Sequence, residues 1–406
     1  MIITPRSLLQ SAAAMALSTL LALPALAQTP IKIGISTPLQ VQVGRDTVDG
    51  AQMAIDEINA KGGLLGRKLQ LISADETENP EQGISAIKKL TGDEKVDVIV
   101  GGYTSGVTLA QLPHLSAAKT IYIGVGAASP AITAKVKQDY DNYKYIFRSS
   151  PPNSFHVARS VIGFINGFLK GELGLTKIAI VGENAKWVQD LIPVLKKGVA
   201  DSGLEIVTSE LFDTATTDFS PILSKVKASG AQYMVAILSH ASSDTFAKQW
   251  YDARLPIPYG GIDVKSMDAD FFSRVGGKAI GELVTGNSAA RAPLSPVTIP
   301  FFDGFKARYK REPVYTGNGA YDALMIYASA VARAKSVDAN AVIKELEKTD
   351  QPGTPGRLQF DESHDIKAGP GLVNLLYLQW QENGTRAIIW PKELRSGKYI
   401  TAPWIK

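Results

Sequence analysis

The sequence predicts an α/β fold with two lobes, each built on a parallel sheet. Three observations lead to this prediction: strands alternate with amphipathic helices from residue 31 onward, a break containing two prolines follows at 147–152, and a second series then begins. Strands joined by helices run parallel with right-handed crossovers, which leaves helices on both faces of each sheet. Ligands of such sheets bind at the carboxyl ends of the strands.

The first series contains four predicted strands with helices between them. The strands are expected at 31–36, 68–72, 96–102 and 121–126, and the helices at about 45–60, from 79 onward, and at 106–118. In the first helix Ala51, Ile55 and Ile58 recur at helical spacing and predict its buried face. Asn79 suits the cap of the second helix and Pro80 its first turn.

The second series repeats the pattern and ends differently. We expect helices at 154–171, 187–202, from 220 onward and at 242–253, with strands at 177–181, 204–208, 233–238 and 258–262. An extended crossing at 283–288 leads to helices at 298–310, 318–334 and 339–348. The last strands are predicted at 357–360, 373–380 and 386–390, and Asn383-Gly384 predicts the turn of an antiparallel hairpin.

Residues 1–27 have the pattern of a secretory signal peptide. Arg6 is followed by an apolar, small-residue run that ends in Ala25-Leu26-Ala27, a sequence that signal peptidase accepts. An uncleaved membrane anchor is the alternative, but Ser18 and Pro24 interrupt the run, and a spanning helix needs about 20 mostly apolar residues. We therefore expect cleavage near Ala27 and a soluble mature chain that works outside the cytoplasm.

Composition excludes several classes of function. The chain of 406 residues has no cysteine, which rules out thiolate catalysis, thiolate metal sites and a lipid-modified N-terminal cysteine. Its net charge of +4 is spread along the chain, so no nucleic-acid partner is expected. His114, His156, His240 and His364 lack metal-ligand spacing, and hydrolase and nucleotide-binding motifs are missing. We expect no enzyme activity, no metal and no cofactor.

Seven segments, in order along the chain, carry a resemblance to a known family. They are IGISTPL (33–39), DGAQMAIDEINAKGGLLGRKL (49–69), GGYTSGVT (101–108), PAIT (130–133), YIFRSSP (145–151), TTDFS (216–220) and AYDA (320–323). The chain resembles periplasmic solute-binding proteins of ABC importers, specifically the branched-chain amino-acid-binding (Leu/Ile/Val-binding) family with the type I periplasmic binding fold. The run 49–69 is the most specific of the seven.

The resemblance implies two Rossmann-like lobes joined by a three-crossing hinge. The crossings would lie near 147–150, 283–288 and 349–357. The lobes would then comprise 28–147 plus 287–353, and 148–286 plus 354–406. It also implies a periplasmic monomer that captures a small solute and delivers it to ABC permease and ATPase subunits at the inner membrane. A sensor of the same fold that signals to a receptor is the alternative.

The resemblance implies that the first lobe holds a ligand carboxylate. Ser105 corresponds to a ligand-binding hydroxyl after the third strand, and Ala127 and Ser129 correspond to donors in the loop after the fourth. Hydroxyls and backbone N–H groups at helix N-termini suit an anion. Ordinary helix capping is the alternative role for these residues. Tyr103 and Arg45 are near enough in sequence to contribute, although Arg45 is expected to be a solvated charge.

In the second lobe, Trp187 corresponds to an aromatic side chain that closes over the ligand, and Ser239 ends another strand. His240 is expected to be structural or solvated. Amino-acid binders place a carboxylate for the ligand ammonium where this chain has Ile262. Either Asp263 takes that role, or no ammonium is bound. Val43 replaces a frequent tyrosine, so aromatic and aliphatic carboxylates compete with branched-chain amino acids as ligands.

Overall fold

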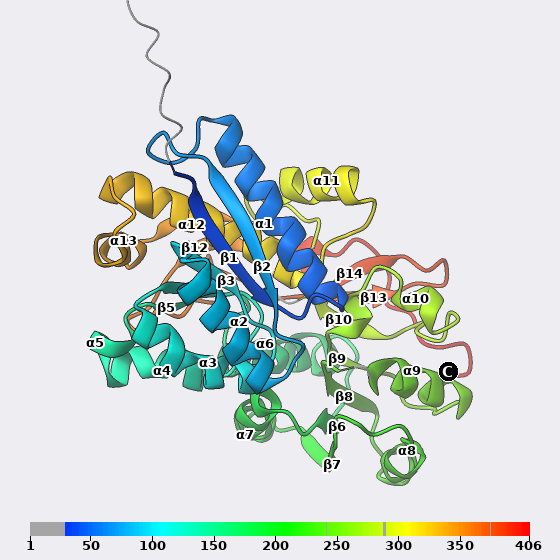
Figure 1. Cartoon of the computed structure of the whole chain (residues 1–406). Helices are drawn as coiled ribbons and strands as arrows, with labels where there is room; N and C mark the ends of the chain where they lie inside the picture. Colours follow the sequence, from blue (N-terminus) through cyan, green and yellow to red (C-terminus); the bar gives the residue numbers. More distant parts are fainter. Residues whose placement is uncertain (1–28, 241, 287–289, 374) are drawn as a thin grey trace, which may run out of the picture.

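Two sheets, each with helices on both faces, form the two lobes of the computed structural model (Figure 1). The structure describes residues 29–240, 242–286, 290–373 and 375–406, so the expected signal peptide lies outside the described residues. Among the described residues, none of the helices combines the length and apolar character needed to cross a bilayer.

The first sheet is fully parallel, with the strand order β2-β1-β3-β4-β5. Its strands are β1 (Ile31–Thr37), β2 (Leu69–Asp75), β3 (Val98–Gly101), β4 (Ile121–Gly124) and β5 (Ile146–Arg148). Its helices are α1 (Gln42–Ala60), α2 (Pro80–Lys88) with a π-helical turn (Lys89–Asp93), α3 (Ser105–Ala118), α4 (Pro130–Gln138), α5 (Tyr140–Tyr143), α11 (Thr298–Tyr309), α12 (Tyr315–Ala334) and α13 (Ala339–Leu346).

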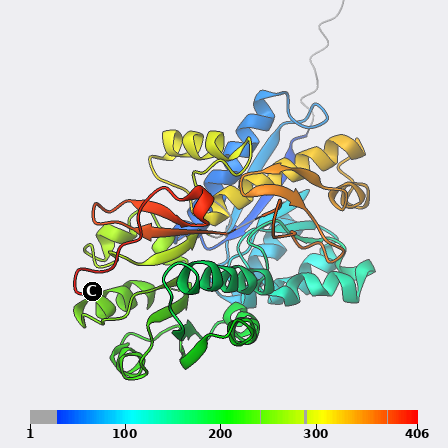
Figure 2. The same cartoon turned by 180° about the vertical axis from the view of Figure 1, so that it is seen from behind.

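Alternate side chains of the first sheet enter two different cores. Val98 and Val100 of β3 pack with apolar residues of α1, α11, α12 and α13, whereas Ile99 packs with residues of α2, α3 and α4. This is the two-sided burial that a parallel sheet requires. Figure 2 shows the helices from 298 to 346, in yellow to orange, returning to this lobe after the chain has built most of the other.

The second sheet has the strand order β14-β13-β10-β9-β8-β6-β7. Its strands are β6 (Lys177–Glu183), β7 (Glu205–Phe212), β8 (Tyr233–Leu238), β9 (Tyr259–Asp263), β10 (Leu283–Gly286), β13 (Leu376–Trp380) and β14 (Arg386–Trp390). Its helices are α6 (Ser154–Phe164) with a π-helical continuation (Ile165–Lys170), α7 (Lys186–Asp201), α8 (Ser220–Ala228), α9 (Ser242–Asp252), α10 (Phe271–Arg274) and 3-10 turns at Lys265–Met267 and Lys392–Leu394. The last two strands, β13 and β14, form the predicted antiparallel hairpin.

The chain crosses between the lobes three times, and the third crossing differs from the prediction. The hairpin of β11 (Asp350–Gly353) and β12 (Gly356–Gln359) folds back along the first lobe. Phe360, Ile366 and Val373 then pack into the first lobe's core. After them, Leu375 is the next residue along the chain that packs into the second lobe's core. The chain thus still packs in the first lobe at Val373, beyond the expected crossing at 349–357, because these apolar side chains have their burial site in the first lobe.

The first crossing begins later than expected, because Phe147 and Arg148 belong to a fifth parallel strand. Ile146 to Arg148 pair with Tyr122 to Gly124 of β4, and α6 begins at Ser154 in the second lobe. Arg148 is fully buried and binds Asp365 through both carboxylate oxygens, with Nε 2.8 Å from Oδ1. This ion pair ties the end of β5 to the segment that precedes the third crossing.

Candidate ligand-binding site between the two lobes

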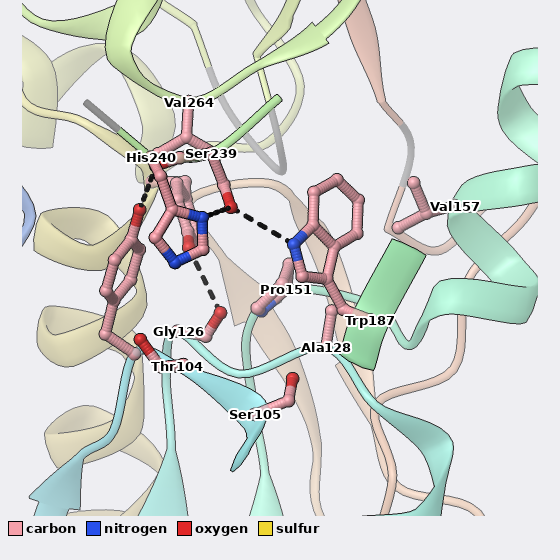
Figure 3. A pocket seen from close by; sticks show the side chains of 12 residues that line it. Thr104, Ser105, Gly126, Ala128, Pro151, Val157, Trp187, Ser239, His240 and Val264 are labelled. Carbon is pink, nitrogen blue, oxygen red and sulfur yellow. Dashed lines mark hydrogen bonds between the residues drawn. The ribbon is translucent and has the colours of Figure 1, made fainter. Parts of the chain in front are cut away.

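A narrow cavity lies where the carboxyl ends of the two sheets face each other (Figure 3). Its empty volume of about 460 Å³ includes space that is open to solvent, and the room enclosed between the two walls is small. The first lobe contributes Tyr103, Thr104, Ser105, Gly126, Ala128 and Tyr315 to its lining. The crossing and the second lobe contribute Pro151, Val157, Trp187, Ser239, His240 and Val264.

Hydroxyl groups at the start of α3 form the polar part of the first-lobe wall. The Ser105 hydroxyl accepts a hydrogen bond from the Ser129 backbone N–H at 3.1 Å, which leaves its own proton available to a ligand. The Thr104 hydroxyl is shielded from solvent, and no hydrogen-bond partner for it is found in the described part of the chain. Both groups lie beside the unpaired N–H groups that begin a 14-residue helix. This wall therefore presents donors suited to an anionic group.

The loop after β4 brings the backbone close to the same point. A side chain at Gly126 would place its Cβ 2.1 Å from the carbonyl oxygen of Gly102, so only glycine fits there. The Tyr315 hydroxyl, from the first turn of α12, donates to the Gly126 carbonyl at 3.1 Å. Tyr315 packs with Val43 and Tyr103, so a tyrosine from α12 lines the cavity beside the buried Val43.

A buried carboxylate, Glu183 at the end of β6, organises the second-lobe wall. Its oxygens accept hydrogen bonds from the Ser239 N–H at 2.9 Å, the His240 N–H at 3.1 Å, His240 Nδ1 at 2.9 Å and Trp187 Nε1 at 3.3 Å, and also from the Ser239 hydroxyl. Trp187 Nε1 also donates to the Ser239 hydroxyl oxygen at 3.1 Å. Glu183 thus fixes the three polar side chains of this wall.

Charge on Glu183 and His240 is mutually supported. Burial alone would raise the pKa of the Glu183 carboxyl, but the hydrogen bond and charge of His240, together with Ser239, lower it below its usual value. Burial likewise opposes protonation of His240, and the hydrogen bond and charge of Glu183 outweigh it, so the pKa of His240 is raised. The ion-pair form of the two residues is the favoured one.

Sequence reasoning missed Glu183 and its counterpart in the first lobe, Glu76. Glu76 directly follows β2, is fully buried, and accepts a hydrogen bond from the Tyr103 N–H at 3.1 Å. Both residues are acidic side chains that end or directly follow an apolar strand, where polar side chains of a parallel sheet gather. An acidic residue at the carboxyl end of a strand is therefore the sequence signal that could have identified both. The predicted strands end too early to reveal it, at residues 72 and 181.

Four of the seven predicted site residues line the cavity, namely Tyr103, Ser105, Trp187 and Ser239, and His240 joins them. Ala127 and Ser129 do not. Ala127 packs in the core beneath α3 and α4, and its carbonyl accepts from Arg148 Nη1 at 3.1 Å, so its neighbours Gly126 and Ala128 face the cavity instead.

Ser129 contacts the other lobe rather than the cavity. Its hydroxyl accepts from the Ala131 N–H at the start of α4 and donates to Asp190 Oδ2 of α7 at 2.6 Å. Other hydrogen bonds also cross between the lobes, among them those from the Tyr103 hydroxyl to the Ser239 carbonyl at 2.7 Å and from the Ala269 N–H to Gln42 Oε1 at 3.2 Å. The two lobes are therefore in direct contact around the cavity.

Asp263, the predicted substitute for an ammonium-binding carboxylate, is buried inside the second lobe and does not line the cavity. Its Oδ1 accepts from the Ser266 N–H at 3.1 Å, and burial raises the pKa of its carboxyl to about 7. Ile262 is a core residue. Arg45 is an exposed side chain that donates to the Gln40 carbonyl at 2.7 Å, as expected for a solvated charge.

The described residues contain no group of three or more histidine, aspartate or glutamate side chains that could hold a metal ion. The cavity offers hydroxyls, an imidazole, an indole and apolar surface, a set that suits binding of a small organic molecule.

Comparison with known proteins agrees with this geometry. Residues 30–377 match the family model described as "Periplasmic binding protein". The Leu/Ile/Val-binding protein homolog 3 of Brucella melitensis is 25% identical over 348 residues, which cover 84% of this chain and 90% of that protein. The leucine-, isoleucine-, valine-, threonine- and alanine-binding protein of Pseudomonas aeruginosa is 25% identical, with 89% and 92% covered.

Solved structures share the fold. The branched-chain amino acid transporter substrate-binding protein of Streptococcus pneumoniae, in complex with isoleucine, superposes with a TM-score of 0.75 at 22% identity and covers 89% of this chain and 100% of that one. A solute-binding protein of Rhodopseudomonas palustris, in complex with benzoate, has a TM-score of 0.75 at 17% identity, with 93% and 99% covered. The chain belongs to the periplasmic binding protein family, whose fold it has, and is a solute-binding protein and not an enzyme.

Proposed function

We propose that the mature chain, cleaved near Ala27 and exported to the periplasm, is the substrate-binding component of an ABC importer. It captures a small carboxylate-bearing solute, an amino acid or an aromatic or aliphatic acid, by closure of its two lobes. The closed form is then delivered to the permease and ATPase subunits at the inner membrane. The names of its relatives in Brucella and Pseudomonas and the family match support this role.

One observation carries the carboxylate part of the proposal: two hydroxyls, of Thr104 and Ser105, face the cavity at the N-terminus of α3, and that of Thr104 is buried without a partner in the described chain. A buried donor without an acceptor is costly unless a ligand supplies one. A carboxylate supplies acceptors and also interacts favourably with the positive end of the helix. Tyr103, Trp187 and Tyr315 would contact the apolar body of the solute.

A ligand screen tests the proposal. The purified mature protein is heated with isoleucine, benzoate, succinate or benzamide, because a bound ligand raises the melting temperature by mass action. We expect at least one carboxylate to raise it and benzamide, the uncharged analogue of benzoate, to have little effect. A shift with benzamide alone would contradict the assignment of a carboxylate to the first-lobe wall.

Replacement of Ser105 tests its hydroxyl. Ser105→Ala removes one hydrogen bond to a charged ligand group and should weaken binding of the best carboxylate by about 1–3 kcal/mol, measured by isothermal titration calorimetry. The matched control is Ser85→Ala, which alters an exposed serine of α2 in the same lobe. An unchanged dissociation constant for Ser105→Ala would remove Ser105 from the binding site.

A further inference from the structure

We propose that His240, held by Glu183, binds a second acidic group of the solute, so that the cavity takes compact dicarboxylates with an apolar body in preference to amino acids. This inference rests on the proposed function and names the solute class of the same site. It makes His240 a specificity-determining residue of the second lobe, facing the hydroxyls of the first.

The orientation of the imidazole is fixed from one side. Glu183 binds both the Nδ1 and the backbone N–H of His240, at 2.9 and 3.1 Å. Because a carboxylate accepts at Nδ1, that nitrogen carries a proton. The other ring nitrogen points away from Ser239 toward Thr104 and Gly126 of the facing lobe (Figure 3). No hydrogen bond to this Nε2 atom is found among the described residues, so it is available to a ligand in the cavity.

The second-lobe wall offers donors and no free carboxylate. Glu183 is fully buried and already accepts five hydrogen bonds from Trp187, Ser239 and His240, so its oxygens are occupied. Asp263 lies outside the cavity lining, and none of the twelve described lining residues is acidic. A ligand ammonium would therefore lose its hydration without gaining an anionic partner, which is unfavourable.

The charges around His240 favour its protonated form. Glu183 of β6 is in direct contact, Glu78 of the loop after β2 adds negative potential from the first lobe, and Lys265 after β9 opposes both. The Lys265 ammonium lies 5.8 Å from the centre of the Tyr103 ring. The direct contact with Glu183 prevails over burial and over Lys265, and the pKa of His240 is raised. Protonated His240 donates from Nε2, and nearby Lys265 further favours an anion there.

The two walls thus present donors on opposite sides of an apolar space. Thr104 and Ser105 lie on one side, and His240 lies on the other. The lining also includes the apolar and aromatic side chains of Trp187, Tyr315 and Val264. A solute that satisfies both walls has an acidic group at each end of a short apolar or aromatic body, as terephthalate has.

Calorimetry with three probes tests the inference. We expect terephthalate to bind at least about tenfold more tightly than benzoate at pH 6, because one additional charge-assisted hydrogen bond is formed, and isoleucine to bind more weakly than either. Both carboxylates stay ionised above pH 6, so terephthalate binding should weaken as the pH rises through the raised pKa of His240, whereas benzoate binding should stay nearly unchanged.

Two variants separate His240 from a general effect. His240→Gln should reduce terephthalate affinity about tenfold or more at pH 6 and abolish its pH dependence, with benzoate affected much less. His114→Gln, on α3 away from the cavity, is the matched control and should behave like the wild type. An NMR titration of the imidazole signals should show that the pKa of His240 rises when terephthalate binds, a change that a merely structural histidine would not undergo.

The outcomes distinguish the inference from the proposed function. Equal affinities for benzoate and terephthalate, or tighter binding of isoleucine than of terephthalate, would overturn the dicarboxylate assignment and leave a carboxylate-binding protein. Unchanged terephthalate binding in His240→Gln would remove His240 from the site. If none of the carboxylates binds at millimolar concentration, the carboxylate part of the proposed function fails and the inference fails with it.

Discussion

Two buried carboxylates, Glu76 and Glu183, stand behind the two walls of the cavity, one in each lobe. Glu76 accepts hydrogen bonds from the Ser36 hydroxyl at 3.0 Å, from Gln111 at 3.1 Å and from the Tyr103 backbone. Burial raises the pKa of Glu76 to about 7, whereas the charge and hydrogen bond of His240 keep Glu183 ionised. The Glu76 carboxyl therefore changes its charge near pH 7, whereas the Glu183 carboxylate stays charged and favours a positive charge on the His240 imidazole at the cavity.

A third buried carboxyl, Asp263, gives a pH dependence of stability. Burial raises its pKa from 3.8 to about 7, and burial together with the charge of Asp263 raises the pKa of the neighbouring Glu282. Between about pH 4 and 7 the folded protein keeps a proton that the unfolded chain has lost. The free energy of unfolding therefore falls as pH rises through this window, and the stabilising contribution is complete only below it.

Replacing Asp263 removes its own contribution to this dependence. Asp263→Asn keeps an acceptor for the Ser266 N–H, and its stability relative to the wild type should grow by about 2–4 kcal/mol from pH 4 to pH 8. Urea denaturation at both pH values measures the change. The control is Asp93→Asn, at an exposed position, for which the difference should stay constant with pH. A constant difference for Asp263→Asn would show that this carboxyl is ionised in the folded protein.

At the level of helices and strands, the segment after β12 is held by the ion pair of Arg148 and Asp365. Both side chains are buried, and the Asp365 carboxylate also accepts from Asn153 Nδ2 at 2.7 Å and the Thr133 hydroxyl at 3.1 Å. The Arg148 guanidinium reaches the carbonyls of Ala127 and Ser129 at 3.1 and 2.7 Å. These hydrogen bonds fix the loop after β4 to the first crossing. Gly126 and Ala128 of this loop line the cavity.

Breaking this pair should be expensive. Asp365→Ala leaves a buried guanidinium without its carboxylate, and we expect a loss of about 3–5 kcal/mol in the free energy of unfolding, measured by urea denaturation. The nearby Glu362→Ala breaks an exposed pair with Lys137 and should leave the denaturation midpoint almost unchanged. Equal effects of the two substitutions would mean that Arg148 finds another partner in the variant.

The spacing of apolar residues predicts most strands and helices, because it repeats regularly within each of these segments. The run 233–238 and the run 386–390 form strands with the expected bounds, β8 and β14. The third crossing was missed because the burial of Phe360, Ile366 and Val373 is decided by which lobe they reach. Pro151 and Pro152 predict a crossing that includes residues 147–148, but these two residues end β5. Such choices depend on contacts between distant segments, which a single sequence does not display.

The sequence also predicts part of the candidate site, namely the residues whose position follows from the strand that precedes them. Ser105, Trp187 and Ser239 follow strands, and their place at the cavity follows from topology. The prediction for the loop after β4 differs from the structure by one residue: Gly126 and Ala128 line the cavity, whereas the side chain of Ala127 packs into the core. Glu183 went unnoticed because its importance comes from three partners, Trp187, Ser239 and His240, two of which are more than fifty residues away.

The whole molecule has its lobes in contact, joined by hydrogen bonds between Tyr103 and Ser239, Ser129 and Asp190, and Gln42 and Ala269. In a hinged protein, bonds that exist only in the closed form shift the equilibrium toward it, and the ligand adds its own preference for that form. A residue that makes such a bond without touching the ligand should therefore influence affinity.

Asp190 provides the test of this linkage, because its side chain binds Ser129 across the lobes and it is absent from the cavity lining. Asp190→Ala should weaken ligand binding by about 0.5–1.5 kcal/mol. It should also increase the radius of gyration of the ligand-free protein in small-angle X-ray scattering. Asp201→Ala, at the exposed end of the same helix, is the control and should change neither quantity. An unchanged affinity in Asp190→Ala would mean that this bond does not contribute to closure.

A crystal structure of the mature protein grown with its tightest-binding carboxylate examines the whole account at once. It should show the solute enclosed between Trp187 and the start of α3, with carboxylate oxygens within about 3.2 Å of the Thr104 and Ser105 hydroxyls. A solute bound elsewhere on the protein, with these hydroxyls still lacking an acceptor, would contradict it.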